Sequence, residues 1–212
     1  MRKNWAALAL TGMLCLTTFA GTQTVSAETA DSAKQVDIVF THDTHSHLNT
    51  FTTIVDEAEK EVGGFARINT LIQEQKAKNP DTLVIDGGDF SMGTLVQTVY
   101  EDEAAELRML GAIGCEVTTF GNHEFDYRSS GLAQMLKSAA ESGDALPELV
   151  VCNVDWDAME AAGLNDGQQQ ILSGFEEYGV KDYVVLQKGD VNVAVTGVFG
   201  VDALACAPTC EL

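Results

Sequence analysis

From Val36 onward, short apolar runs alternate with segments of helical periodicity, and the runs predict β-strands. The predicted strands cover residues 36–41, 82–86, 116–120, 148–152, 181–187 and 191–198. Strands and helices alternate up to about residue 152, which favours a parallel α/β sheet. Lys188-Gly189-Asp190 predicts a hairpin turn, so the last two strands should be antiparallel.

Three segments carry apolar residues at helical spacing. The first begins after Gly63-Gly64 and ends before Pro80, and the second covers Asp102 to Leu110. The third contains Leu132, Met135, Leu136 and Ala139. Residues 158–174 contain three glutamines and several small residues, and we expect them to form an exposed excursion.

The first 27 residues have the pattern of a secretion signal. Arg2 and Lys3 form a basic start, residues 6–19 are mostly apolar, and Val25-Ser26-Ala27 offers a cleavage site. The apolar stretch is too short to predict a membrane span. We expect a cleaved signal peptide (1–27), a short linker (28–34) and an exported protein that is extracellular, at the cell surface or periplasmic.

The chain is strongly acidic, with 12 Lys+Arg against 32 Asp+Glu and a formal net charge of −20. Loss of Arg2 and Lys3 with the signal peptide leaves 10 basic against 32 acidic residues, a charge of −22. Phosphate contacts need Lys and Arg, so we expect no nucleic-acid partner. A small phosphate ester stays compatible with this charge, because a bound metal ion neutralises it locally.

Four cysteines lie beyond the predicted signal peptide: Cys115, Cys152, Cys206 and Cys210. Export permits disulfides, and four thiols allow three pairings that the sequence does not choose among. Cys206 and Cys210 are close enough in sequence to pair in a tight loop. Cys115 and Cys152 have apolar neighbours and are expected to be buried.

Metal-capable side chains follow three of the predicted strands. Asp43 and His45 come after the first, Asp89 after the second, and Asn122 and His123 after the third. Loops at the carboxyl ends of strands are where open α/β sheets hold their ligands. Carboxylate, imidazole and amide groups are ligands of divalent metal ions. Three such blocks in order predict a metal site.

The spacing of these residues suggests their roles. Asp43 and His45 are two apart, so in an extended segment both side chains leave on the same face and can share one metal ion. The carboxylate of Asp89 can bridge two cations, and the preceding glycines permit a tight turn. His42 should point the other way, into the core.

His123 need not bind metal, because its side chain should point differently from that of Asn122. An imidazole beside a metal site can donate a proton to a phosphoryl or leaving-group oxygen as charge develops there. Asp126, three residues later, could fix the tautomer and orientation of that ring. Asn122 and His123 are therefore also candidates for contacting the substrate.

These motifs resemble a known family. Asp43-x-His45, Gly88-Asp89 and Gly121-Asn122-His123-Glu124 are similar to the three leading blocks of the calcineurin-like metallophosphoesterases. The Asn-His-Glu-Phe-Asp-Tyr run at 122–127, with Gly-Gly-Phe-Ala-Arg at 63–67, resembles the 5′-nucleotidase branch. The resemblance covers roughly residues 35–212 and implies the N-terminal part of a metallophosphatase domain, an α/β fold built as a four-layer αββα sandwich.

The resemblance also implies a site with two divalent metal ions, such as zinc or manganese. Asp43 and His45 would hold the first ion, Asp89 would bridge the two, and Asn122 would hold the second. His123 and Asp126 would form the catalytic dyad. The implied function is hydrolysis of nucleoside 5′-monophosphates, which are small-molecule substrates.

The sequence departs from the family pattern in one major respect. The family continues with a lone histidine and a Gly-His-x-His block, all metal ligands, whereas the last of the four histidines here is His123. The chain thus resembles the front half of a catalytic domain and looks truncated. His42 stands where the family often has Asn, and Arg128 where it often has Gly.

Two further functions stay open. The same site could act on cyclic nucleotides, sugar nucleotides or a sulfur ester, because the residues that set specificity are not in this sequence. Alternatively, the chain could be an inactive fragment that binds one metal ion weakly. The sequence does not decide the metal, the oligomeric state, or whether the protein is released or held at the envelope.

Four polar residues near the blocks have two interpretations each. His47 could be a third ligand, but we favour a solvent-facing role. Glu124 could be a base, but we favour support of its loop through hydrogen bonds. Arg67 could contact phosphate, although on a helix it is more often exposed. We expect Asp86 to be structural.

Overall fold

The computed structural model describes residues 34–212. The predicted signal peptide (1–27) and nearly all of the predicted linker (28–34) lie outside the described residues, so both stay predictions. Within residues 34–212, no helix combines the length and the apolar character needed to cross a membrane.

The central sheet consists of four parallel strands, as the sequence predicts, and their order is β1-β4-β5-β6. Their bounds are Ile38–Thr41 (β1), Leu83–Asp86 (β4), Val117–Thr118 (β5) and Glu148–Leu149 (β6). Each strand lies inside its predicted range but is shorter. Thr41 pairs with Asp86, and Ile85 with Val117. The carboxyl ends of β1, β4 and β5 therefore meet at one edge of the sheet.

The main core lies between this sheet and the helices, including α1 (Phe65–Lys78) and α4 (Arg128–Glu141). Both helices match their predicted segments. The predicted helix at 102–110 is wrong in detail, because the backbone breaks at Ala104 (φ 45°). It forms two helices instead, α2 (Tyr100–Glu103) and α3 (Ala105–Ala112).

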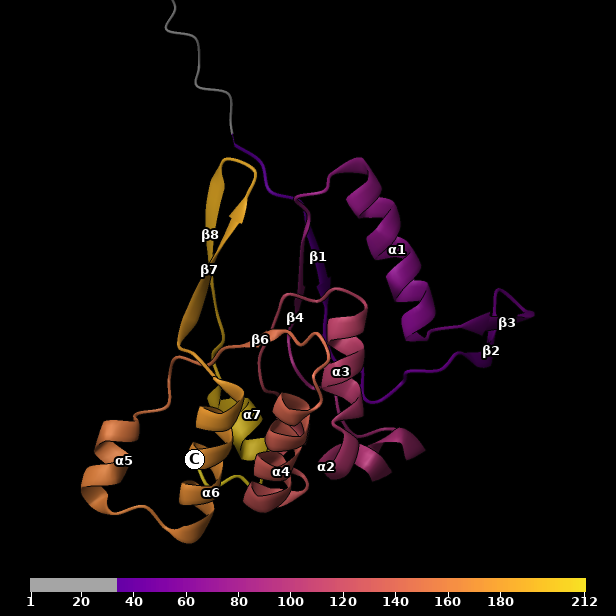
Figure 1. Ribbon diagram of the computed structural model, residues 1–212. Coiled ribbons are helices and arrows are strands. Elements are labelled where there is room, and N and C mark those ends of the chain that lie inside the picture. Colours follow the sequence, from indigo (N-terminus) through magenta and orange to yellow (C-terminus); the bar gives the residue numbers. More distant parts are fainter. Residues whose placement is uncertain (1–33) are drawn as a thin grey trace, which may run out of the picture. The chain divides into compact units, whose positions relative to one another are not determined.

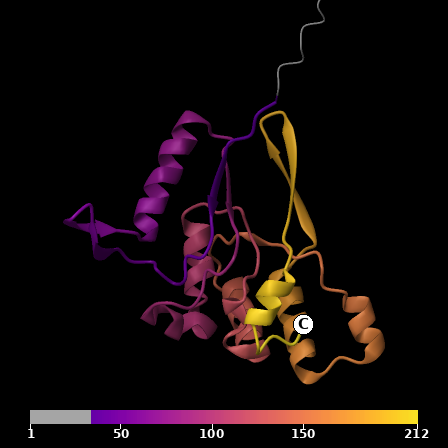
Figure 2. The same ribbon diagram turned by 180° about the vertical axis from the view of Figure 1, so that it is seen from behind.

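A β-hairpin covers part of the other face of the sheet. It consists of β7 (Tyr183–Lys188) and β8 (Val191–Thr196), paired antiparallel as predicted. Val184 of β7 packs with Val117 and Val150, while Ile38 and Phe40 of β1 stay 53% and 57% exposed. Figures 1 and 2 show this hairpin and α1 on opposite sides of β1.

The expected exposed excursion at 158–174 is wrong. This region contains α5 (Trp156–Ala162) and α6 (Asp166–Tyr178). Ile171 and Phe175, one turn apart, are buried at 0% and 5% exposure. Gln169 and Gln170 are exposed, and Gln168 forms a capping box with Asn165, so overall polarity concealed an amphipathic helix.

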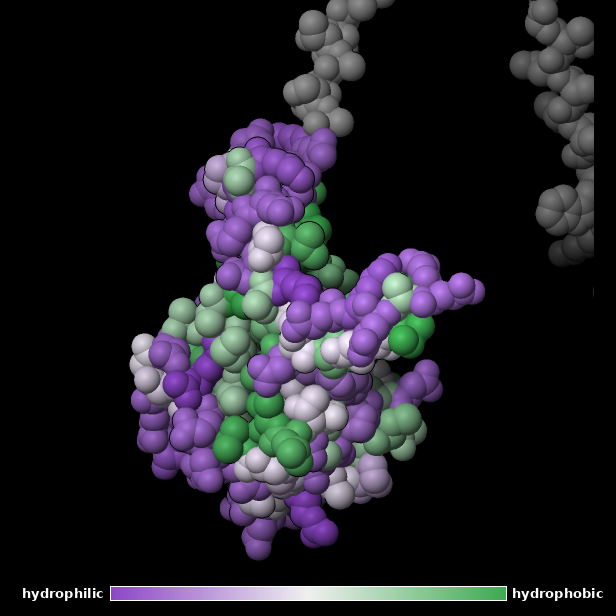
Figure 3. Space-filling model, turned by 90° about the vertical axis from the view of Figure 1, so that its right-hand side faces the viewer, coloured by the Kyte–Doolittle hydropathy of each residue, from purple (hydrophilic) through white to green (hydrophobic). Residues whose placement is uncertain are grey.

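Several short elements were not predicted. The antiparallel hairpin β2 (Phe51–Val55) and β3 (Ala58–Val62) projects beside the start of α1 in Figure 1. The remaining elements are the 3-10 turns η1 (Leu95–Val99) and η2 (His123–Phe125), and the helix α7 (Val201–Cys206). The face shown in Figure 3 is hydrophilic in its upper part and gathers its hydrophobic side chains lower down.

The four cysteines in the described part of the chain are free thiols. Cys115 is buried, as expected. Cys152 is exposed, so its predicted burial is wrong. It comes three residues after the end of β6, where the chain leaves the sheet, and its apolar neighbours Val150 and Val151 are buried while its own side chain is not.

Candidate functional site

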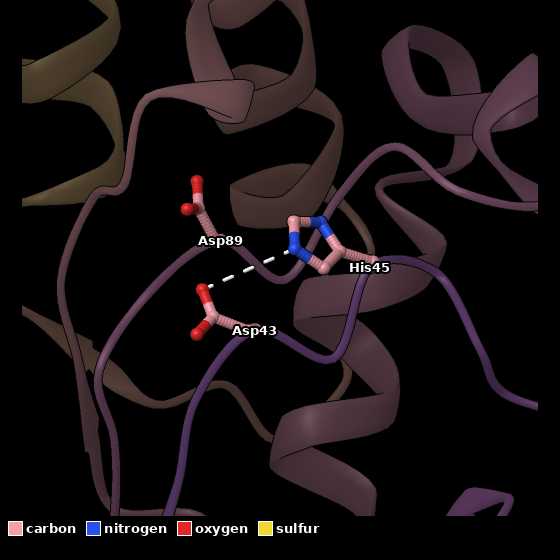
Figure 4. Close-up of side chains that lie close together, drawn as sticks. All are labelled: Asp43, His45 and Asp89. Atoms are coloured by element: carbon pink, nitrogen blue, oxygen red, sulfur yellow. Dashed lines mark ion pairs between the residues drawn. The ribbon is translucent and has the colours of Figure 1, made fainter. Parts of the chain in front are cut away.

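The loops that follow β1, β4 and β5 meet at the carboxyl edge of the sheet. Asp43 and His45 come from the first loop and Asp89 from the second, and their ligand atoms all lie within 4.8 Å of one another (Figure 4). Asp43 Oδ1 is 3.9 Å from His45 Nε2. The structure thus brings together three of the four predicted metal ligands in one group.

The backbone that presents Asp43 and His45 is not extended as expected. Asp43, His45 and Ser46 have φ values of 51°, 45° and 53°, in the left-handed region. Their amide groups donate to the carbonyls of residues 88–90, at 3.0, 3.1 and 2.8 Å. The two side chains are therefore placed by pairing with the neighbouring loop rather than by strand alternation.

Two glycines let the loops after β4 and β5 touch. A Cβ on Gly88 (φ 86°) would lie 2.7 Å from the amide nitrogen of Gly121. A Cβ on Gly121 would lie 2.1 Å from Asp89 Oδ1, so the carboxylate packs directly over this glycine. The same oxygen accepts a 2.9 Å hydrogen bond from the backbone amide of His123. Asp89 thus links the metal group to the His123 loop.

The residues present fit a divalent metal ion. His45 Nδ1 lies 3.2 Å from the carbonyl oxygen of Ser91, which can only accept, so Nδ1 carries the proton. The lone pair of Nε2 then faces Asp43 Oδ1. Two carboxylates and one imidazole suit a first-row divalent ion. Asn122, half-buried directly before η2, follows Gly121, on which the Asp89 carboxylate packs.

His123 and Asp126 form the predicted pair. His123 Nδ1 lies 2.7 Å from Asp126 Oδ2, which leaves Nε2 free. Burial lowers the pKa of His123, but the hydrogen bond and charge of Asp126, with the charges of Asp89 and Glu124, raise it overall. The His123 ring meets the His45 ring edge-on, with centroids 5.1 Å apart. The pair therefore borders the metal group.

Glu124 supports the loops after β4 and β5 through hydrogen bonds, which is the role that we favoured for it. It is fully buried, and its carboxylate accepts hydrogen bonds from the amides of Asp89 (3.0 Å), Ser91 (3.0 Å) and Gly121 (2.6 Å) and from the Ser91 hydroxyl (2.9 Å). Burial raises the pKa of Glu124 to about 7, against the lowering effect of these donors. It ties the Asp89 loop to the Asn122 loop.

Asp86 is structural, as expected. It is 5% exposed and accepts hydrogen bonds from the Thr41 hydroxyl (2.7 Å), the Gly88 amide (2.9 Å) and the Thr118 hydroxyl (2.9 Å). Burial raises the pKa of its carboxyl group, with these donors opposing the shift. Asp86 thereby fastens the ends of β1 and β5 to β4.

The other polar candidates lie outside the metal group. His47 is exposed, and its Nδ1 lies 2.8 Å from the carbonyl oxygen of His45. Arg67 is exposed on α1 and pairs with Glu61 at 3.3 Å. The prediction that His42 enters the core is wrong, because its side chain is 59% exposed and contacts Asp43. His42 continues the alternation of Ile38 and Phe40 and stacks on Phe40, so it lies on the face of β1 that stays exposed.

Sequence reasoning missed the support of the His45 loop by Glu106. The buried Ser46 hydroxyl donates to Glu106 Oε1 at 2.6 Å, and the Thr94 hydroxyl donates to the Ser46 carbonyl at 2.7 Å. Burial raises the pKa of Glu106. The one signal for this role is a glutamate on the apolar face of a predicted helix, next to Leu107.

Comparisons with known proteins show which family this chain belongs to. The family model of the calcineurin-like phosphoesterases matches residues 36–196. The chain is 32% identical over 115 residues to human 5′-nucleotidase, covering 53% of this chain and 20% of that protein. It is 28% identical over 178 residues to the trifunctional nucleotide phosphoesterase protein YfkN of Bacillus subtilis, covering 79% of this chain and 11% of that protein.

Solved structures share the fold. The 5′-nucleotidase precursor from Thermus thermophilus superimposes with a TM-score of 0.61 and 27% identity, over 80% of this chain and 29% of that one. The NAD nucleotidase of Haemophilus influenzae gives a TM-score of 0.58 at 22% identity, over 79% and 26%, which shows the fold alone. The chain spans about a fifth of the length of human 5′-nucleotidase. It belongs to the calcineurin-like phosphoesterases, with a mixed α/β fold, and is related to 5′-nucleotidases over part of their length.

Proposed function

We propose that this chain is a metal-dependent phosphoesterase that hydrolyses nucleoside 5′-monophosphates. The observation that carries the proposal is the group Asp43, His45 and Asp89 beside the His123–Asp126 pair. The substrate class is supported by the similarity to proteins named 5′-nucleotidase.

In this proposal Asp43 and His45 would hold one divalent ion, Asn122 would hold a second, and Asp89 would be shared by both. Two such ions, when bound, polarise a phosphoryl oxygen and lower the pKa of water to near neutrality. The donor set suits zinc or manganese. Gly121 leaves room for the Asp89 carboxylate, and the His123 amide fixes one of its oxygens.

His123 supplies the proton chemistry of the chain itself. Asp126 holds Nδ1, so a protonated His123 presents Nε2–H to a phosphoryl or leaving-group oxygen. Because the pKa of His123 is raised, its ring stays protonated at a higher pH than an ordinary imidazole does. Asn122, the preceding residue, contacts the same phosphate group. Glu124 holds the loop rigid beneath both.

We extend the proposal to the architecture and the location. The central sheet and the hairpin β7–β8 form the two inner layers of a four-layer αββα sandwich. The half-exposed Ile38 and Phe40, on β1 beside the hairpin, support further cover on that face. The basic and apolar pattern of residues 1–27 supports export.

The test is phosphate release from AMP by the purified chain with added Mn²⁺ or Zn²⁺. We expect EDTA-sensitive turnover that Asp89→Asn abolishes, whereas Glu160→Gln, an exposed carboxylate on α5, leaves it unchanged. Activity of Asp89→Asn within a few-fold of the unmodified chain would refute the bridging role. Faster release from a 2′,3′-cyclic nucleotide than from AMP would move the substrate to that class.

A second function is favoured by one observation. Among residues 34–212, one group of three carboxylate and imidazole ligands comes together, namely Asp43, His45 and Asp89. The chain would then bind a single metal ion without turnover. Calorimetric binding of one Mn²⁺ per chain without phosphate release from AMP would select this function over the first.

A further inference from the structure

His42 has a specific contact that the proposed mechanism does not use. Its Nδ1 lies 2.5 Å from Oδ2 of Asp43, whereas the other carboxylate oxygen, Oδ1, lies 3.9 Å from His45 Nε2. A carboxylate can only accept, so His42 Nδ1 carries the donated proton. The two oxygens of Asp43 therefore face different partners.

The position of the His42 ring is itself fixed. The ring stacks on Phe40, with centroids 5.5 Å apart and planes at 29°. Gly87 makes room for this stack, because a Cβ there would lie 3.0 Å from Phe40 Cζ and 3.1 Å from His42 Cβ. Phe40 thus covers one face of the His42 ring and limits its rotation.

Asp43 needs such a restraint more than Asp89 does. Its side chain is 51% exposed, and an exposed carboxylate otherwise samples several rotamers. Asp89 is half-buried, and the His123 amide holds one of its oxygens. Groups that hydrogen-bond to a metal ligand orient it, and their loss typically lowers metal affinity by about 10–100-fold.

We propose that His42 is a positioning residue that holds Asp43 Oδ2 and so directs Oδ1 into the group formed with His45 and Asp89. This proposal rests on the metal site of the proposed function. His42 acts through Asp43 and does not itself touch the ion or the phosphate ester. Its role should therefore appear in metal affinity, in the absence of any substrate.

The test is calorimetric titration of the metal-free chain with Mn²⁺ and Zn²⁺. We expect His42→Ala to weaken binding by about 10–100-fold. His42→Asn should restore affinity to within about three-fold, because its amide nitrogen is as many bonds from Cα as Nδ1. His42→Gln, whose amide reaches one bond further, should behave like His42→Ala. His47→Ala is the matched control, an exposed histidine of the same loop outside the metal group, and should bind like the unmodified chain.

Each result of these titrations supports or refutes the positioning role of His42. Equal affinities of His42→Ala and the unmodified chain would refute the positioning role alone. Weak binding by both His42→Ala and His42→Asn would also refute it, because a hydrogen-bond donor at the same distance from Cα would then fail to orient Asp43. No metal binding by the unmodified chain would overturn the metal site and with it the proposed function. Circular dichroism melting of the metal-free variants should coincide, since His42 is exposed.

Discussion

Gly121→Ala is the sharpest perturbation of the site, because Gly121 lies directly beneath the Asp89 carboxylate. The added Cβ would stand 2.1 Å from Asp89 Oδ1 and 2.7 Å from the Asp89 amide nitrogen. Gly121 does not have a positive φ, so the conflict is steric and not conformational. The variant therefore isolates the position of one metal ligand.

The size of the effect follows from these distances. Real Cβ atoms essentially never approach another heavy atom within 3.0 Å, so Oδ1 must retreat by at least 0.9 Å. Metal–ligand distances tolerate only about 0.2 Å, so such a shift removes Asp89 from the group. Crowding a packed site costs about 1–3 kcal/mol of stability. We expect both this loss and a fall in Mn²⁺ or Zn²⁺ affinity of at least about ten-fold.

Urea unfolding in EDTA and calorimetric metal titration measure the two effects separately. Gly200→Ala is the control, because Gly200 also has a negative φ (−71°) and a Cβ there would meet nothing within 4 Å. In an Asp89→Ala background, Gly121→Ala should cost less stability, since the clashing carboxylate is gone. Metal affinity within three-fold of the Gly200→Ala control would refute the reasoning.

Two other predictions concern carboxylates. Burial raises the pKa of Glu124 from 4.5 to about 7, so its stabilising contribution is present below about pH 4.5 and is lost as the pH rises through 7. The free energy of unfolding in EDTA should therefore fall by up to about 3 kcal/mol between pH 5 and 8. Glu124→Gln has no titrating carboxyl group at this position and should not show this fall. If urea unfolding gives the same dependence of unfolding free energy on pH for both proteins, the prediction is contradicted. Glu211 accepts from the Ser129 hydroxyl (3.0 Å) in the first turn of α4 and lies against Gly167 in the first turn of α6. Glu211→Gln should lower the free energy of unfolding by about 1 kcal/mol through the helix dipoles, and a loss no larger than that of Glu160→Gln would exclude this role.

The sequence predicted the parallel sheet and the edge that carries the site. Apolar runs mark β1, β4 and β5, and parallel strands end at the same edge of a sheet. Chemistry-bearing residues after each strand must therefore converge, whatever the loops between them do. The spacing of His123 and Asp126 likewise matches one short helical turn, so their contact was predictable locally.

Local pattern failed where burial depends on distant partners. The polar composition of residues 158–174 concealed α6, whose Ile171 and Phe175 are buried against the main core. Likewise, Glu106 lies on a helix and Ser46 in a loop 60 residues away, and neither local sequence pattern predicts that the two side chains form a hydrogen bond.

The sequence by itself thus determined the edge of the sheet at which Asp43, His45 and Asp89 come together. Only the tertiary structure decided how they face one another. Asp43, His45, Ser46 and Asp89 adopt left-handed backbone that non-glycine residues avoid in isolation. Hydrogen bonds between loops more than 40 residues apart, with the carboxylate of Glu124 beneath, hold them in that conformation. No local propensity encodes such pairing, because its stabilising partners exist only once the sheet has formed.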